Sequence, residues 1–272
     1  NNYYIYIYMM NKPYKIVVFD LDETLGYFTE FGIFCDCLNY YFKNDKYSDI
    51  HFNELLDLFP EFIRPKIFSI LKYLKLKKEE NKCYKVMIYT NNQGHKNWAL
   101  NIKKYFDTKI DYKLFDQIIA AFKVRGKPVE LGRTSHDKTI DDFINCTKLP
   151  TDIEICFIDD VYHDGMNNDR VYYINIKPYY NKLSITNMIS QFLDSTLVKD
   201  VHNTSDFIES IEKEFNRYNY RITEKTKEEQ EIDEIISKRM LQHLKQFFYE
   251  NNNKTLNRNK REKKNKTVKN KK

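Results

Sequence analysis

The chain has 272 residues, of which 42% are hydrophobic and 31% are charged, so it can bury the core of an α/β domain and is too apolar to be disordered throughout. Its formal net charge of +6 comes from residues 254–272, which hold ten Lys or Arg and one acid. The rest of the chain is close to neutral, so the positive charge belongs to a C-terminal tail. No run of roughly 18 apolar residues occurs, which argues against a membrane span.

Five short apolar runs predict the strands of a sheet, at residues 14–21, 84–89, 115–122, 154–158 and 171–176. Helical spacing of apolar residues predicts helices between several of them, at residues 65–78, 96–106 and 137–145. Strands that alternate with helices form βαβ units with parallel strands. The expected fold is therefore a Rossmann-like α/β core with a central parallel sheet flanked by helices.

The predicted core domain spans residues 14–200 and contains one interruption, a mixed and aromatic segment at residues 26–60 that forms a small flap or insert. Residues 1–13 are an N-terminal extension. Residues 201–250 carry apolar positions at helical spacing and predict a C-terminal helical extension that packs on the domain or on a partner. Residues 251–272 are polar and basic, and we expect a disordered tail there.

The cysteines and the tail bear on the cellular compartment. The cysteines at positions 35, 37, 83, 146 and 156 form no paired motif, which favours reduced thiols in an intracellular protein, either cytoplasmic or nuclear. The basic tail could bind nucleic acid or acidic proteins weakly through its charge, or serve as a nuclear import signal.

Polar side chains follow the predicted strands at the points where the strands end. They are Asp20, Asp22 and Thr24 after the first strand, Thr90 and Asn91 after the second, Lys138 at a helix start, and Asp159, Asp160 and Asp164 after the fourth. In an open α/β sheet, ligands bind outside the carboxyl ends of the strands. We therefore expect these side chains to converge on one site.

The residue types in these blocks match the needs of phosphate-ester hydrolysis. Asp20 and Asp22 are two residues apart and leave an extended chain on the same side, so Asp20 can attack phosphorus while Asp22 moves the proton. Thr90 and the backbone N–H of Asn91 can hold a phosphoryl oxygen. Lys138 can neutralise both Asp20 and the phosphoryl group.

Three other cations, Lys123, Arg125 and Lys127, compete with Lys138 for that role. We favour Lys138 because the sequence around it predicts a helix start, and the N-terminus of a helix attracts anions.

A hard divalent cation is needed to shield an attacking carboxylate from an anionic phosphoryl group, and Mg²⁺ accepts carboxylates while keeping several waters. The expected ligands of Mg²⁺ are Asp20, Asp22, Asp159, Asp160 and Asp164.

These blocks, in this order, resemble the signature of the haloacid dehalogenase superfamily of phosphotransferases. The matching residues are Asp20-x-Asp22-x-Thr24, Thr90, Lys138, and the acidic block formed by Asp159, Asp160 and Asp164. The resemblance covers roughly residues 14–176. It implies a Mg²⁺-dependent phosphatase that forms an aspartyl-phosphate at Asp20.

A narrower resemblance is to phosphatases that act on the C-terminal domain of RNA polymerase II and to their small relatives. It rests on Glu23, which gives Asp-Glu-Thr-Leu after the nucleophile, and on Arg64-Pro65 before the second motif. It implies a phosphoserine or phosphothreonine protein as the substrate. Arg64 would then either contact the substrate or anchor the helix that follows it.

Two other functions remain open at this point. The first is a phosphatase for a small metabolite or a nucleic-acid end, which a full cap over the site or a basic groove beside it would favour. The second is a non-catalytic adaptor that works through the C-terminal helices and the basic tail.

Overall fold

The computed structural model describes residues 14–94, 97–150, 152–218 and 225–269, with side chains up to Tyr249. The expected N-terminal extension at residues 1–13 lies outside the described residues. The strands of the main sheet are β1 (Tyr14–Phe19), β2 (Lys85–Tyr89), β3 (Phe115–Ile119), β6 (Ile153–Asp159) and β7 (Val171–Asn175). All five correspond to strands that the sequence predicts.

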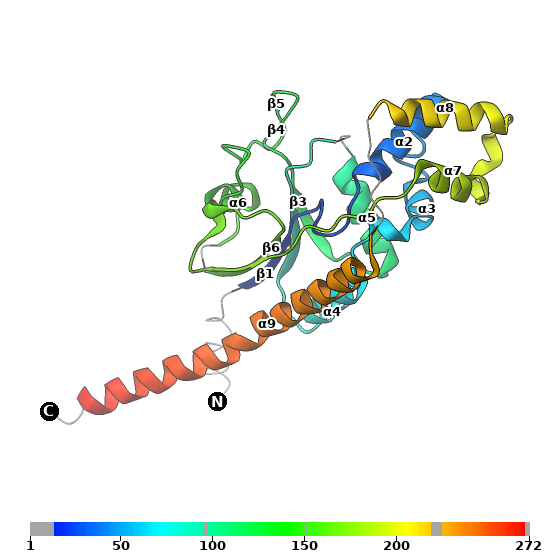
Figure 1. Cartoon of the computed structure of the whole chain (residues 1–272). Coiled ribbons are helices and arrows are strands. Elements are labelled where there is room, and N and C mark those ends of the chain that lie inside the picture. Colours follow the sequence, from blue (N-terminus) through cyan, green and yellow to red (C-terminus); the bar gives the residue numbers. More distant parts are fainter. Residues whose placement is uncertain (1–13, 95–96, 151, 219–224, 270–272) are drawn as a thin grey trace.

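The five strands form one sheet in the order β3-β2-β1-β6-β7 (Figure 1). Every neighbouring pair in this sheet is parallel. The carboxyl ends of the strands therefore share one edge, and β1 lies at the centre between β2 and β6. This arrangement confirms the predicted α/β fold with a parallel, Rossmann-like sheet.

The sheet separates two apolar cores, because successive residues of a strand point to opposite faces. In β1, Val17 and Phe19 enter the larger core, while Ile16 and Val18 enter the smaller one. All four side chains are fully buried. Burial on both faces explains why these strands consist of continuous apolar runs rather than alternating patterns.

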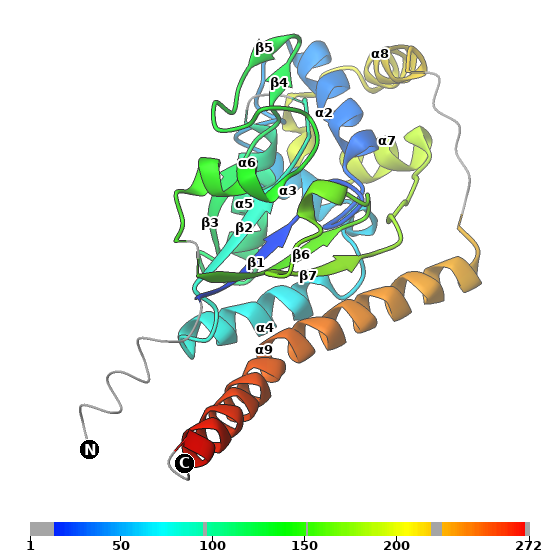
Figure 2. The same cartoon turned by 90° about the vertical axis from the view of Figure 1, so that its left-hand side faces the viewer.

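Helices cover both faces of the sheet (Figure 2). On the larger core lie α4 (Ile67–Glu79) and α5 (Trp98–Lys109), which connect β1 to β2 and β2 to β3. On the smaller core lies α6 (Ile140–Thr147), which buries Ile140 and Phe143. The hydroxyl of Thr139 caps α6 by accepting the backbone N–H of Asp142 at 3.1 Å. This cap fixes the residue that precedes it, Lys138.

The insert expected at residues 26–60 is present, and it is helical. It consists of α2 (Thr29–Phe42), α3 (Phe52–Asp57) and the 3₁₀ helix η1 (Pro60–Phe62). The ring of Phe31 in α2 lies 5.3 Å from the ring of Phe52 and 5.8 Å from that of Trp98, centroid to centroid. The aromatic residues of this segment therefore extend the larger core, and the segment is not a hairpin flap.

A short hairpin that the sequence analysis missed lies between β3 and α6. Its strands are β4 (Lys123–Val124) and β5 (Lys127–Pro128), which pair antiparallel. The two residues between them, Arg125 and Gly126, have φ angles of 49° and 77°, as a two-residue hairpin turn requires. The hairpin follows the carboxyl end of β3 and projects beyond the sheet in both views (Figures 1 and 2).

The C-terminal helices pack on the larger core and confirm the predicted helical extension. After α7 (Ile185–Leu193) and the 3₁₀ helix η3 (Thr196–Asp200), α8 (Thr204–Asn216) places Phe207 5.0 Å from the ring of Tyr41 in α2. The last helix, α9 (Lys227–Lys269), runs beside α4 and buries Met240 and Leu244 (Figure 2). Within the described ranges, no helix combines the length and apolar character that crossing a membrane requires.

The structure differs from the expectation of a disordered tail, because α9 continues to Lys269. Residues 227–269 contain no glycine or proline, and Lys and Arg are good helix formers. The local sequence therefore permits the helix to continue past the part of α9 that packs on the core.

Candidate active site

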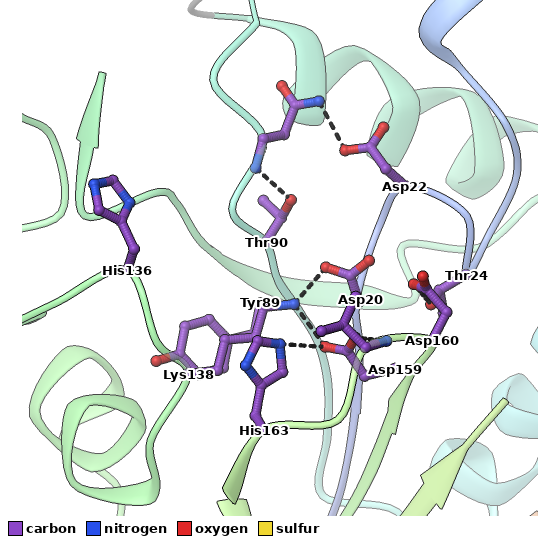
Figure 3. Close-up of polar contacts among 12 residues, drawn as sticks. Asp20, Asp22, Thr24, Tyr89, Thr90, His136, Lys138, Asp159, Asp160 and His163 are labelled. Atoms are coloured by element: carbon purple, nitrogen blue, oxygen red, sulfur yellow. Dashed lines mark hydrogen bonds and ion pairs between the residues drawn. The ribbon is translucent and has the colours of Figure 1, made fainter. Parts of the chain in front are cut away.

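The candidate site lies at the carboxyl edge of the sheet, where three central strands end side by side (Figure 3). Asp20 directly follows β1, Thr90 directly follows β2, and Asp159 is the last residue of β6. The backbone N–H of Asp20 donates to Ile158 at 2.9 Å, and that of Thr90 donates to Ile119 at 3.0 Å. Sheet pairing therefore continues to the first residues of the site and fixes their positions.

Lys138 is the charged centre of the site. Its Nζ forms ion pairs with Oδ1 of Asp20 and, at 2.7 Å, with Oδ2 of Asp159. The lysine is only 2% exposed, and both partners are buried. Burial acts to lower the pKa of Lys138, but the charges of Asp20 and Asp159 outweigh it and raise that pKa. Lys138 therefore remains a fixed cation beside the predicted nucleophile.

Glycine at position 165 allows the loop after β6 to approach Lys138. A Cβ atom there would lie 2.6 Å from the side chain of Thr139 and 3.0 Å from the carbonyl oxygen of Lys138. The competing cations Lys123, Arg125 and Lys127 belong to the β4–β5 hairpin instead. The structure thus brings Lys138, and none of these three, into contact with Asp20.

Three carboxylates could hold a metal ion. One oxygen from each of Asp20, Asp159 and Asp160 lies within 4.8 Å of the other two. An all-oxygen donor set of this kind suits a hard cation such as Mg²⁺. Thr24 donates its hydroxyl to Oδ1 of Asp160 at 3.0 Å, and Asn175 donates to the backbone carbonyls of Asp159 and Asp160, both at 3.1 Å. The donor set therefore fits the expected ion.

Two of the expected metal ligands lie outside this group of three. Asp164 is exposed at the first position of the 3₁₀ helix η2 (Asp164–Met166), and it does not belong to the group of carboxylates within reach of one another. His163 approaches instead, with Nε2 lying 3.6 Å from Oδ2 of Asp159. The spacing of the acidic block suggested Asp164, but the turn that begins there decides which side chain faces the site.

Asp22, the other residue outside the metal group, faces Asn92 across the site. Nδ2 of Asn92 donates to Oδ2 of Asp22 at 2.8 Å. The backbone N–H of Asn92 donates to the hydroxyl of Thr90 at 3.0 Å. Thr90 accepts in this bond, so its own hydrogen can be donated to a phosphoryl oxygen.

Asn92 is the site residue that sequence reasoning missed. The only available signal was the polar run after the second strand, and it pointed to Asn91. Asn91 lies beside Thr90, and the buried Oδ1 of its side chain has no hydrogen-bond partner among the described residues. Asn92 therefore positions two residues of the site, which its place in the sequence did not reveal.

Burial changes the acid–base behaviour of the carboxyl groups. Desolvation raises the pKa of Asp22 to about 7, with a further contribution from the charge of Asp20, although the bond from Asn92 acts to lower it. Desolvation, followed by the charge of Asp20, also raises the pKa of Asp160. A carboxyl group that titrates near neutrality can donate a proton and then accept one, as a general acid and base must.

Glu23 and Thr24 form a tight turn next to Asp22. Glu23 has a φ angle of 56°, in the left-handed region, and its backbone N–H donates to Gly26 at 2.8 Å. Desolvation, followed by the charge of Asp22, raises the pKa of Glu23 to about 7. The turn therefore carries a further carboxyl group to the edge of the site.

Arg64 has a structural position, in contrast to the substrate contact that the sequence left open. Its Nε donates to the carbonyl of Thr24 at 2.6 Å, and its Nη2 donates to the carbonyls of Glu23 and, at 3.0 Å, Lys177. The side chain is 1% exposed. A substrate could reach it only if the turn moved, so the described contacts assign Arg64 to holding the Glu23–Thr24 turn.

Comparison of the chain with protein-family models, with curated proteins and with solved structures gives no match.

The geometry predicts which carboxylates matter for metal binding. Replacing Asp160 with Asn removes a ligand of the expected Mg²⁺ site, for which Mn²⁺ serves as the probe. We expect Asp160→Asn to weaken Mn²⁺ binding by at least about tenfold. This is the lower end of the loss in affinity that follows when supporting residues of metal sites are removed. Asp164→Asn is the matched variant and should bind Mn²⁺ with nearly the affinity of the wild type. Titration calorimetry on the purified chain measures both. Equal losses in the two variants would contradict the three-carboxylate site.

The raised pKa of Asp22 predicts a pH-dependent effect on stability in the metal-free protein. Between the ordinary pKa of an aspartate and about 7, the folded state binds a proton that the unfolded state has released, so stability falls as the pH rises. Asp22→Asn removes this loss. We expect a higher melting temperature than wild type at about pH 8, with a difference that shrinks toward pH 4. Asp169→Asn, an exposed control, should show no such trend.

Proposed function

We propose that this chain is a Mg²⁺-dependent phosphomonoesterase of the haloacid dehalogenase type, with Asp20 as the nucleophile. The observation that carries the proposal is the buried contact of Lys138 with Asp20 and Asp159 beside a third carboxylate, Asp160. This arrangement supplies a nucleophile, a fixed cation and a metal site within one cluster. The transfer of an anionic phosphoryl group explains this combination better than a purely structural role of the ion pairs does.

In the first step, a carboxylate oxygen of Asp20 attacks phosphorus and the ester bond to the leaving group breaks. Lys138 holds Oδ1 of Asp20 and orients the carboxylate for this attack. Asp22 gives its proton to the departing oxygen, so the product leaves as an alcohol. Thr90 donates its hydroxyl to a phosphoryl oxygen. An acyl phosphate on Asp20 remains.

In the second step, Asp22 takes a proton from water, and the water oxygen attacks phosphorus. The bond between phosphorus and Asp20 breaks, inorganic phosphate leaves, and the carboxylate of Asp20 is restored. Mg²⁺ held by Asp20, Asp159 and Asp160 would neutralise the negative charge that builds up on the phosphoryl oxygens. Asn92 keeps Asp22 in place through both steps.

The substrate class we propose is a phosphoserine or phosphothreonine segment of a protein. Two features support it: the resemblance carried by Glu23 and Arg64-Pro65, and the β4–β5 hairpin at the carboxyl edge of the sheet. The hairpin carries Lys123, Arg125 and Lys127, whose charges could attract the backbone and acidic side chains around a phosphorylated residue. The helical insert packs its aromatic residues into the larger core. This favours an insert that is part of the domain over one that forms a separate cap above the site.

Asp20→Asn tests the nucleophile. We expect the purified chain to hydrolyse p-nitrophenyl phosphate with Mg²⁺ and to lose this activity with a chelator. Asp20→Asn should reduce hydrolysis to background, while Asp169→Asn, an exposed carboxylate outside the cluster, should match the wild type. Radiolabelled phosphate should remain on the wild-type protein after a rapid acid quench and be released by hydroxylamine. Wild-type protein without Mg²⁺-dependent turnover would favour the adaptor function instead.

Asp22→Asn tests the acid–base role through the choice of leaving group. General acid catalysis contributes roughly 10²- to 10⁴-fold and matters most when the leaving oxygen is basic. We therefore expect kcat to fall much further for a phosphoserine peptide than for p-nitrophenyl phosphate. Phosphorylated metabolites and 5′-phosphorylated oligonucleotides in the same assay test the alternative substrates. Equal losses for both leaving groups would remove Asp22 from the role of acid.

A further inference from the structure

The turn formed by Glu23 and Thr24 needs support from outside itself. Glu23 has a positive φ angle although it is not glycine, and such a conformation is unfavourable unless surrounding contacts hold it. The turn also connects Asp22 to Thr24, which bonds to Asp160. A shift of this turn would therefore move both the proposed acid and a residue that holds the metal site.

Tyr179 and Arg64 both contact the Glu23–Thr24 turn and hold it in place. The backbone N–H of Tyr179 donates to the carbonyl of Glu23 at 2.9 Å, and its hydroxyl donates to the carbonyl of Glu61 at 2.7 Å. The guanidinium of Arg64 lies 5.4 Å from the centre of the Tyr179 ring. Both residues thus contact the turn and each other.

A second cation reaches the Tyr179 ring from the C-terminal part of the chain. Nζ of Lys225 lies 4.2 Å from the ring centre, so the ring is held by two cations. Lys225 forms an ion pair with Asp233 in the first turns of α9, and Asp233 is 4% exposed. The charge of Asp233 also acts to raise the pKa of Arg64, which burial lowers to about 10. One carboxylate of α9 therefore balances both cations.

Attachment of α9 to the domain does not require this ion pair. Apolar side chains further along the helix, Met240, Leu244 and Phe247, are already buried in the larger core. A buried ion pair is expensive to desolvate, and apolar residues in its place are often neutral or stabilising. The contact of the Lys225–Asp233 pair with Tyr179 therefore explains its presence better than a contribution to the stability of the fold does.

We propose that Tyr179, Lys225 and Asp233 are positioning residues for the Glu23–Thr24 turn, and that α9 is thereby a working part of the active site. The chain of contacts runs from Asp233 to Lys225, from there to the Tyr179 ring, and from the Tyr179 backbone to Glu23. An effect of these residues on catalytic turnover rests on the proposed function. Their effect on the stability of the Glu23–Thr24 turn does not.

Asp233→Asn in the full chain tests the inference, with Glu234→Gln as the matched control. Glu234 is the next residue of α9 and pairs only with surface lysines among the described residues, Lys66 at 3.8 Å and Lys238 at 3.4 Å. Hydrogen exchange followed by mass spectrometry should show about tenfold faster exchange in peptides covering residues 20–27 for Asp233→Asn alone. The kcat should fall about 10- to 100-fold with KM little changed, because a misplaced group costs turnover rather than binding.

Unchanged exchange at residues 20–27 in Asp233→Asn would overturn the inference, whatever the activity. Faster exchange in a protein whose wild type shows no phosphatase activity would support the positioning role and count against the proposed function. If Asp233→Asn unfolds, the double variant Lys225→Met/Asp233→Leu removes both members of the ion pair together, so neither is left unpaired. Faster exchange at residues 20–27 in that folded variant supports the inference, and exchange equal to that of the wild type overturns it.

Discussion

The contact of Lys138 with Asp20 and Asp159 is the interaction on which the rest of the site depends. Three carboxyl groups and one lysine meet at a buried edge of the sheet, so the cluster carries more negative than positive charge when all three carboxyl groups are ionised. Burying such an excess is unfavourable unless another cation joins it. The electrostatics of the metal-free protein thus favour the binding of a cation at this cluster, which is the physical basis of the proposed Mg²⁺ site.

The fold and the centre of the site could be predicted from the sequence because both follow from short-range patterns. Strands buried on both faces consist of continuous apolar runs, and the residue after each run must lie at the carboxyl edge of a parallel sheet. This logic located Asp20, Thr90 and Asp159 with no knowledge of the loops. Lys138 could be predicted for a related reason, since it directly precedes a capped helix.

The remaining features depend on loop geometry and long-range contacts, which no local pattern encodes. The approach of His163 to Asp159 depends on the loop that leads into the 3₁₀ helix η2. The part played by Asn92 depends on a local hydrogen bond to Thr90 and a long-range one to Asp22. The aromatic residues of the insert gave no clear period because they pack on several helices at once. Arg64 was ambiguous because its partners are backbone carbonyls, which carry no sequence signal.

The central place of β1 has a consequence for how the protein is made. β1 is synthesised before the other strands of the described sheet, and its neighbour β6 and the partners of Asp20 come much later in the chain. At a synthesis rate of about 5–20 residues per second, roughly 7 to 28 seconds separate Asp20 from Asp159, the last residue of β6. Throughout that interval the emerging chain exposes an apolar central strand with no partner on one side. Pairing between strands so far apart in the chain is slower than the local contacts of a helical bundle, so apolar surface stays exposed to aggregation for longer.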